Sequence, residues 1–207
     1  MLEQETWEDY RVYNKNTVHV GNSIVVQPYV QRHLHEEEVR FLYAGRLSAV
    51  KNVGPMIEAV KSYDRTCSFT ILGDGEERGK MEKLADGDKR IRFIGAVKPD
   101  EVQRAMKEAD VLIMNSTFEG IPMTILEAIS QGLPVITTDV GGIKEVLTYG
   151  KDSEVTDGSV ERIHTAMDKI LLDYEAYAKA AYDKSLQFDY RKVNRKVFDV
   201  LNESLHW

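Results

Sequence analysis

Between residues 39 and 147, short apolar segments alternate with segments in which apolar residues recur at helical spacing. The apolar segments are rich in β-branched and aromatic residues, which favour strands, and each is followed by a helical pattern. The sequence predicts strands at 39–44, 68–72, 91–94, 111–114 and 134–138, and helices at 56–63, 77–85, 99–109, 122–130 and 143–147. Strands that alternate with helices form a parallel sheet covered by helices on both faces. We therefore predict an α/β fold of this kind.

The alternation stops after residue 150, and three successive helices are predicted at 160–172, 174–186 and 190–205. Ahead of the alternation, residues 18–20 and 24–26 are apolar enough to form two short strands. We predict a division into an N-terminal segment (1–17), a sheet domain that binds the ligand (18–173) and C-terminal helices (174–207).

Composition limits the classes of function. The 207 residues suffice for one domain with an appendage, and a hydrophobic content of 43% supports a sizeable core. The net charge of −7 argues against nucleic acid as a partner. Because Cys67 is the only cysteine, no intrachain disulfide can form, and we expect a cytoplasmic protein. No apolar run is long enough to span a membrane, and residues 1–5 lack the apolar core of a signal peptide.

Two glutamates, Glu119 and Glu127, lie eight residues apart around a predicted turn and helix start. The first N–H groups of a helix have no intrahelical partner and favour an anion such as phosphate. Pro122 fits the first helical position, where a missing N–H costs nothing. Each carboxylate can accept hydrogen bonds from a pair of hydroxyl groups. Such a site suits a ligand that is part phosphate and part polyol, as a nucleotide sugar is.

Two cations, Arg46 and Lys51, follow the first strong strand. Ligands of open α/β sheets bind beyond the carboxyl ends of the strands, so these cations could neutralise a diphosphate. Taken alone they are better read as solvated loop charges, but their position beside the glutamate segment favours binding. The segments 73–75 and 95–97 end the next two strands. Each can be read as an ordinary strand-to-helix turn or as backbone that contacts the ligand.

Other kinds of site find little support. The five histidines are not spaced like the ligands of a metal site. No neighbouring residues mark Cys67 as a catalytic nucleophile, so we interpret it as a core residue. The glycine pair at 141–142 is a weak anion-loop signal. The sequence has neither a Walker loop nor a G-x-G-x-x-G pattern.

Taken together, five motifs resemble a known family. In chain order they are Gly45-Arg46-Leu47 with Lys51-Asn52, Gly73-Asp74-Gly75, Glu119-Gly120-Ile121-Pro122 with Leu126-Glu127-Ala128, Gly132-Leu133-Pro134-Val135-Ile136, and Gly141-Gly142 with Glu145. Their order and spacing resemble the C-terminal half of family 4 (group 1) retaining glycosyltransferases. That family has the GT-B fold, in which two Rossmann-like domains face each other across a cleft. The resemblance covers roughly residues 18–205 and implies a Rossmann-like sheet here.

The resemblance implies a role for each candidate residue. Arg46 and Lys51 would hold the donor diphosphate, Glu119 the transferred sugar and Glu127 the ribose, while residues 95–97 would border the base. Arg46, Lys51 and Glu119 are thus the implied catalytic residues. The implied substrate-binding residues are Gly45, Gly73, Val97, Gly120, Ile121, Pro122, Met123, Thr124 and Glu127. No metal or other cofactor is expected, because protein cations and a helix N-terminus take its place.

The family's N-terminal domain, which binds the acceptor, is not found in the residues before 18. We therefore expect this chain to bind a nucleotide-sugar donor and to transfer little sugar alone. The acceptor is left open as a glycan, a lipid or a small molecule, and the full-length enzyme could lie at the membrane periphery. The family's terminal helices cross back to the N-terminal domain, so we expect exposed apolar surface on them. Two alternatives are a nucleotide-sugar epimerase of related fold and a noncatalytic nucleotide-binding module.

Overall fold

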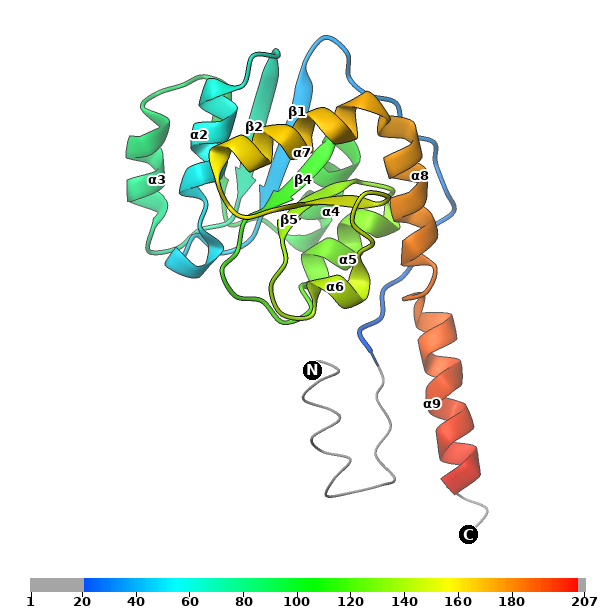
Figure 1. The fold of residues 1–207 in the computed structure, drawn as a ribbon. Coiled ribbons are helices and arrows are strands. Elements are labelled where there is room, and N and C mark those ends of the chain that lie inside the picture. The colour runs from blue at the N-terminus through cyan, green and yellow to red at the C-terminus, as the bar shows by residue number, and fades with distance from the viewer. Residues whose placement is uncertain (1–20, 205–207) are drawn as a thin grey trace.

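The computed structural model describes residues 21–204 and has a six-stranded parallel sheet at its centre (Figure 1). The strands are β1 (Val39–Ala44), β2 (Cys67–Leu72), β3 (Ile91–Gly95), β4 (Val111–Met114), β5 (Val135–Thr138) and β6 (Ser153–Thr156). Their order across the sheet is β3-β2-β1-β4-β5-β6. The predicted α/β, Rossmann-like fold is confirmed, and five of the strands follow the predicted alternation.

The helices lie close to their predicted positions. They are the 3-10 helix η1 (Ala49–Lys51) and the α-helices α2 (Gly54–Ser62), α3 (Arg78–Ala85), α4 (Pro99–Glu108), α5 (Met123–Ser130), α6 (Ile143–Val146), α7 (Val160–Leu172), α8 (Tyr174–Ser185) and α9 (Tyr190–Ser204). Helix α7 has the predicted bounds. Helix α5 begins at Met123, so Pro122 caps it from outside rather than opening it, which corrects the prediction.

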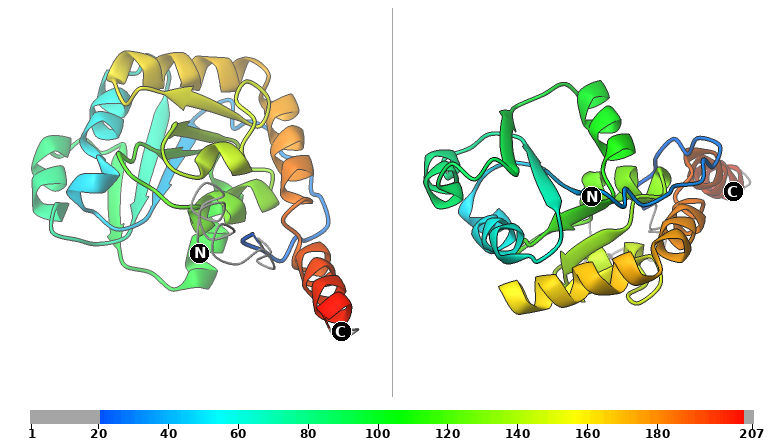
Figure 2. Two further views of the ribbon diagram at one scale, coloured as in Figure 1. Left: turned by 60° about the horizontal axis from the view of Figure 1, so that its bottom comes forward. Right: turned by 90° about the horizontal axis from the view of Figure 1, so that it is seen from above.

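The core has two parts, one on each face of the sheet. Alternate residues of β1 divide between them because successive strand side chains point to opposite faces. Phe41 and Tyr43 pack with α2 and α7, whereas Leu42 packs with α4, α5 and α6. Helices α4 and α7 accordingly lie on opposite sides of the sheet in Figure 2. The sheet therefore buries both faces, as the pattern of apolar strands predicts.

Strand β6 has few apolar residues, and the sequence marks it only weakly at 153–155. It forms because its buried polar groups have partners. Glu154 accepts hydrogen bonds from Tyr177 Oη at 2.5 Å and Lys169 Nζ at 3.0 Å. The preceding Asp152 accepts from the Thr148 backbone N–H at 2.8 Å, while burial raises the pKa of the Asp152 carboxyl. Paired in this way, polar side chains can occupy an edge strand without an unsatisfied group.

The segment from residue 21 to residue 38 crosses the body as an extended strap without a strand of its own. The strand predicted at 24–26 is wrong: Ile24 makes only an isolated bridge with Asp189, because its neighbour is the short turn between α8 and α9. The strand predicted at 18–20 lies outside the described residues. Helix α8 packs its buried Ala178 and Ala181 against the body, whereas α9 extends away from it on the side where the strands end (Figure 1). The proposed three-part division stays a prediction.

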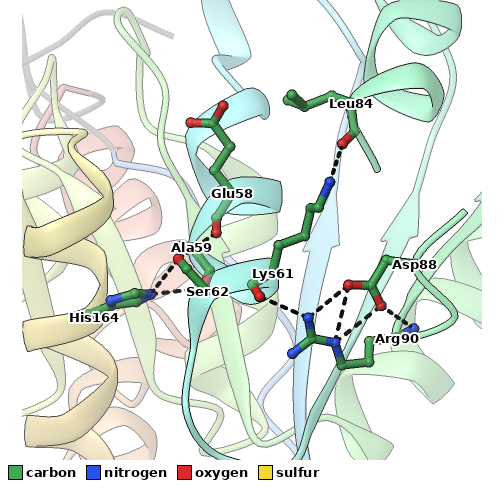
Figure 3. Close-up of polar contacts among 8 residues, drawn as sticks. All are labelled: Glu58, Ala59, Lys61, Ser62, Leu84, Asp88, Arg90 and His164. Atoms are coloured by element: carbon green, nitrogen blue, oxygen red, sulfur yellow. Dashed lines mark hydrogen bonds and ion pairs between the residues drawn. The ribbon is translucent and has the colours of Figure 1, made fainter. Parts of the chain in front are cut away.

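Basic and histidine side chains donate hydrogen bonds to carbonyls at the carboxyl ends of α2 and α3. Figure 3 shows this at α2, where Arg90 Nη2 donates to Lys61 O at 2.9 Å and His164 Nε2 donates to Ala59 O at 2.8 Å. Lys61 Nζ in turn donates to Leu84 O, at the end of α3, at 2.9 Å. These contacts satisfy terminal carbonyls, and the charges of Arg90 and Lys61 complement the negative end of the helix dipole. These helices run antiparallel to the strands. Their amino ends therefore lie at the end of the sheet where the strands terminate, away from the capped carboxyl ends.

Candidate functional site

The candidate site lies where the strand order reverses. Strands β1 and β4 are neighbours in the sheet, but the chain leaves them toward opposite flanks. Open α/β sheets form a crevice at such a switch point, outside the carboxyl ends of the strands. The loop after β1 carries Arg46 and Lys51, and the loop after β4 carries Glu119. The backbone N–H of Thr117 donates to Val50 O at 2.8 Å and so joins the two loops.

Lys51 and Glu119 form an ion pair across the switch point. Glu119 Oε1 accepts from Lys51 Nζ and also from Ser116 Oγ, which lies 2.7 Å away. The side chain of Glu119 is 8% exposed and that of Lys51 is 23% exposed, so the pair is largely shielded from water. The structure thus brings together two of the three predicted catalytic side chains.

Arg46 lies on the same loop but has a different partner. Its Nε and Nη2 donate to Glu76 Oε2 at 3.2 and 3.1 Å, and the two side chains are 72% and 56% exposed. Its carbonyl accepts from Tyr43 Oη at 2.7 Å, which fixes the loop to β1. The pKa of Glu76 is lowered, first by a hydrogen bond from the backbone N–H of Glu76 itself and then by the hydrogen bonds from Arg46. Burial, with the nearby charge of Glu119, raises the pKa of Tyr43.

The glycines after β1 and β2 allow two loops to pack backbone to backbone. Gly73 has a φ of +127°, and a Cβ at this position would lie 1.8 Å from the carbonyl oxygen of Gly45. The Gly45 N–H donates to Leu72 O at 3.0 Å, and the Gly73 N–H donates to Gly95 O at 2.8 Å. The segment 73–75 is therefore a turn that requires glycine. Its backbone lies beside the Arg46 loop.

The turn at residues 120–122 is held from two sides before α5 begins. Asn22 Nδ2 donates to Ile121 O at 3.1 Å from the strap, and the asparagine is buried. On the other side, a Cβ on Gly142 would lie 2.7 Å from Ile121 Cγ1, so the 141–142 loop fits closely against the turn. Sequence analysis missed Asn22, because nothing in the sequence links it to a turn 99 residues away.

Glu127 lies apart from the Lys51–Glu119 pair, in a cavity of about 740 Å³ between the strap, α4 and α5. Met123 and Glu127 line it from α5, and Gln103 lines it from α4. Burial raises the pKa of Glu127. A half-buried carboxylate gains from hydroxyl donors, which is the role predicted for this residue. Val97 packs partly into the core beside α4, and its predicted contact with a base stays a prediction.

Among residues 21–204, no group of three or more histidine, cysteine, aspartate or glutamate side chains could hold a metal ion. Within the same residues, no helix is long and apolar enough to cross a membrane.

Comparisons with known proteins identify relatives of the chain. Residues 27–185 match the family described as "Glycosyl transferases group 1". The sulfoquinovosyl transferase SQD2 of Arabidopsis thaliana is 27% identical over 78% of this chain and 32% of its own length. The alpha-monoglucosyldiacylglycerol synthase of Acholeplasma laidlawii is 27% identical over 79% of this chain and 48% of its own length. The chain thus spans about a third to a half of the length of these relatives.

Solved structures show the same fold. The lipopolysaccharide outer core galactosyltransferase WaaB superposes with a TM-score of 0.81 at 20% identity, over 98% of this chain and 60% of that protein. HepE of Anabaena, in complex with UDP and glucose, superposes with a TM-score of 0.72 at 20% identity, over 81% of this chain and 49% of that protein.

Proposed function

Since the chain belongs to the group 1 glycosyl transferases, we propose that it is the donor-binding half of an enzyme that transfers a sugar from a nucleotide sugar to an acceptor with retention of configuration. The observation that carries this proposal is the Lys51–Glu119 ion pair at the switch point between β1 and β4. It joins a cation suited to phosphate with a carboxylate suited to sugar hydroxyls. The HepE complex with UDP-glucose supports a uridine nucleotide as the first candidate.

Each residue contacts a different part of the donor. Arg46 and Lys51 contact the diphosphate, and the turn at residues 120–122 presents the start of α5 to it. Glu119 accepts hydrogen bonds from the transferred sugar, and Glu127 accepts them from the ribose. Positive charge beside the diphosphate stabilises the negative charge that develops on the leaving nucleotide as the glycosidic bond breaks. Protein cations thereby supply the electrostatic stabilisation without a metal ion.

Nucleotide binding tests the first of these roles. Replacing Arg46 by alanine should weaken binding of a nucleoside diphosphate by about ten- to a hundredfold, because a hydrogen bond to a charged group contributes about 1.5–3 kcal/mol. Calorimetric titration with UDP, GDP and ADP measures the effect and identifies the base. Arg65→Ala is the matched control, since this exposed arginine precedes β2 at the opposite edge of the sheet. Unchanged affinity in Arg46→Ala would reject the assignment.

The two glutamates should respond differently to the attached sugar. Glu127→Gln should weaken a bare nucleotide and its sugar derivative equally, by about tenfold, because the ribose is common to both. Glu119→Gln should weaken only the nucleotide sugar. Titrating UDP and UDP-glucose into both variants separates the roles, and an equal loss of both ligands in Glu119→Gln would show that the division is wrong.

Transfer needs donor and acceptor in contact, and orientation supplies much of the rate. We expect this chain to bind the donor and to transfer its sugar slowly or not at all, because the acceptor side of the cleft comes from a second domain. The assay combines the purified chain, a donor that it binds and a panel of acceptors, before and after addition of an N-terminal domain as a separate chain. Efficient transfer by the chain alone would contradict the donor-half assignment. Binding without transfer in any combination would favour a noncatalytic module.

A further inference from the structure

Both cations assigned to the diphosphate already hold carboxylates. Lys51 pairs with Glu119, and Arg46 pairs with Glu76. A phosphate oxygen that binds either cation must therefore compete with a carboxylate for it. The two competitions differ, because Glu76 is 56% exposed and Glu119 only 8%.

We propose that Glu119 competes with the diphosphate for Lys51, so that the site favours a nucleotide that carries a sugar over the bare nucleoside diphosphate. This inference rests on the proposed function and adds a second role for the same carboxylate. Glu119 acts as a sugar ligand when the donor is bound and as a rival of the phosphate when the sugar is gone.

Burial of Glu119 creates the difference between the two ligands. When a phosphate takes Lys51, the Glu119 carboxylate keeps Ser116 as a donor but loses its cation. A shielded carboxylate without a cation is costly unless other donors replace it. The hydroxyls of a donor sugar can replace the lost contact, whereas a bare nucleoside diphosphate brings no donor to this position.

The Arg46–Glu76 pair offers an internal comparison. When a phosphate takes Arg46, the exposed Glu76 carboxylate is solvated by water, so its release costs little. That cost is the same whether or not the nucleotide carries a sugar. Only the Lys51–Glu119 pair can therefore discriminate between the two ligands.

Competition for Lys51 also affects turnover. The nucleotide donor enters with a sugar and leaves as a nucleoside diphosphate without one. Once the sugar has moved to the acceptor, Glu119 regains Lys51 as its most favourable partner. Its return displaces the diphosphate and so speeds release of this product.

The test is calorimetric titration of each variant with a bare nucleotide and its glucosylated form. UDP, GDP and ADP are first compared on the unmodified chain, and the best-bound base is kept. Glu119→Gln should bind the bare nucleotide about three- to tenfold more tightly, because the rival charge is gone, and the nucleotide sugar about tenfold more weakly. Glu119→Asp, whose shorter side chain withdraws the charge from Lys51, should shift both affinities in the same directions by smaller factors. Glu119→Asp can be titrated in its place if the glutamine variant folds poorly.

Glu76→Gln should tighten both ligands equally, by no more than about threefold, since an exposed pair is weak. Glu77→Gln is the matched control: its carboxylate pairs with Lys80 at 2.9 Å, and neither affinity should change. If Glu119→Gln weakens the bare nucleotide, the competition is overturned while the proposed function stands. If the unmodified chain binds neither form of any nucleotide, the proposed function itself fails.

Discussion

Replacing Gly73 by alanine should remove about 2–6 kcal/mol of the folding free energy, out of roughly 5–15 kcal/mol for a typical domain. Two costs add. The backbone at Gly73 has a φ of +127°, a conformation that costs other residues about 1–3 kcal/mol. In addition, the new Cβ would lie 1.8 Å from the Gly45 carbonyl oxygen, and overpacking against a backbone atom costs about 1–3 kcal/mol or more. Urea denaturation followed by circular dichroism measures the loss.

Two other glycines separate these costs. Gly79 lies inside α3, where an added Cβ would meet nothing within 4 Å, so Gly79→Ala should be neutral or should stabilise the chain by about 0.5–1 kcal/mol. Gly87 has a φ of +70° in open space, so Gly87→Ala should cost only about 1–2 kcal/mol. If Gly73→Ala costs no more than Gly87→Ala, the close contact with Gly45 is not a constraint on the fold.

Replacing Lys51 by methionine should cost about 3 kcal/mol of folding free energy. Methionine keeps a side chain of similar length but leaves Glu119 without its cation. Breaking a buried ion pair typically costs about 3–5 kcal/mol, and the lower end applies because Lys51 is 23% exposed. The same urea experiment, carried out at neutral pH without nucleotide, measures the change.

A double variant shows whether the loss comes from the uncompensated charge. Lys51→Met combined with Glu119→Gln should recover stability to within about 1 kcal/mol of the unmodified chain, since both charges are then gone. If Lys51→Met alone costs less than about 1 kcal/mol, the pair behaves as an ordinary surface pair. The Lys51–Glu119 pair would then be no stronger than the exposed Arg46–Glu76 pair, and Glu119 could not compete with the diphosphate as proposed.

The sequence predicts the sheet well where strand formation depends on local apolar pattern. Strand β1 and helix α7 have the predicted bounds because β1 is a nearly continuous apolar run buried on both faces, whereas α7 buries residues at helical spacing. Strand β6 is marked only weakly because its burial depends on Lys169 and Tyr177, which follow it in the chain. The strand predicted at 24–26 fails because the backbone of Ile24 pairs with the turn between α8 and α9 rather than with another strand.

The sequence predicts where along the chain the residues of the candidate site lie, but not which of their side chains pair with each other. Cations and carboxylates after strands converge because parallel strands end at one edge, and Lys51 and Glu119 do meet there. The choice of Glu76 as the partner of Arg46, and of Ser116 as a second donor to Glu119, depends on side-chain directions in loops. No periodicity encodes these directions. Arg32 is a similar case: it donates to the carbonyls of Met106 and Gln131 at the ends of α4 and α5, and no motif singles it out.

The bridge between Ile24 and Asp189 has a mechanical consequence. The Ile24 N–H donates to Phe188 O and the Tyr190 N–H donates to Ile24 O, both at 2.9 Å, so the strap and the start of α9 are fastened to each other where they leave the body. A force applied to the strap near Ile24 is therefore also transmitted to the start of α9, because the same two backbone hydrogen bonds hold both segments.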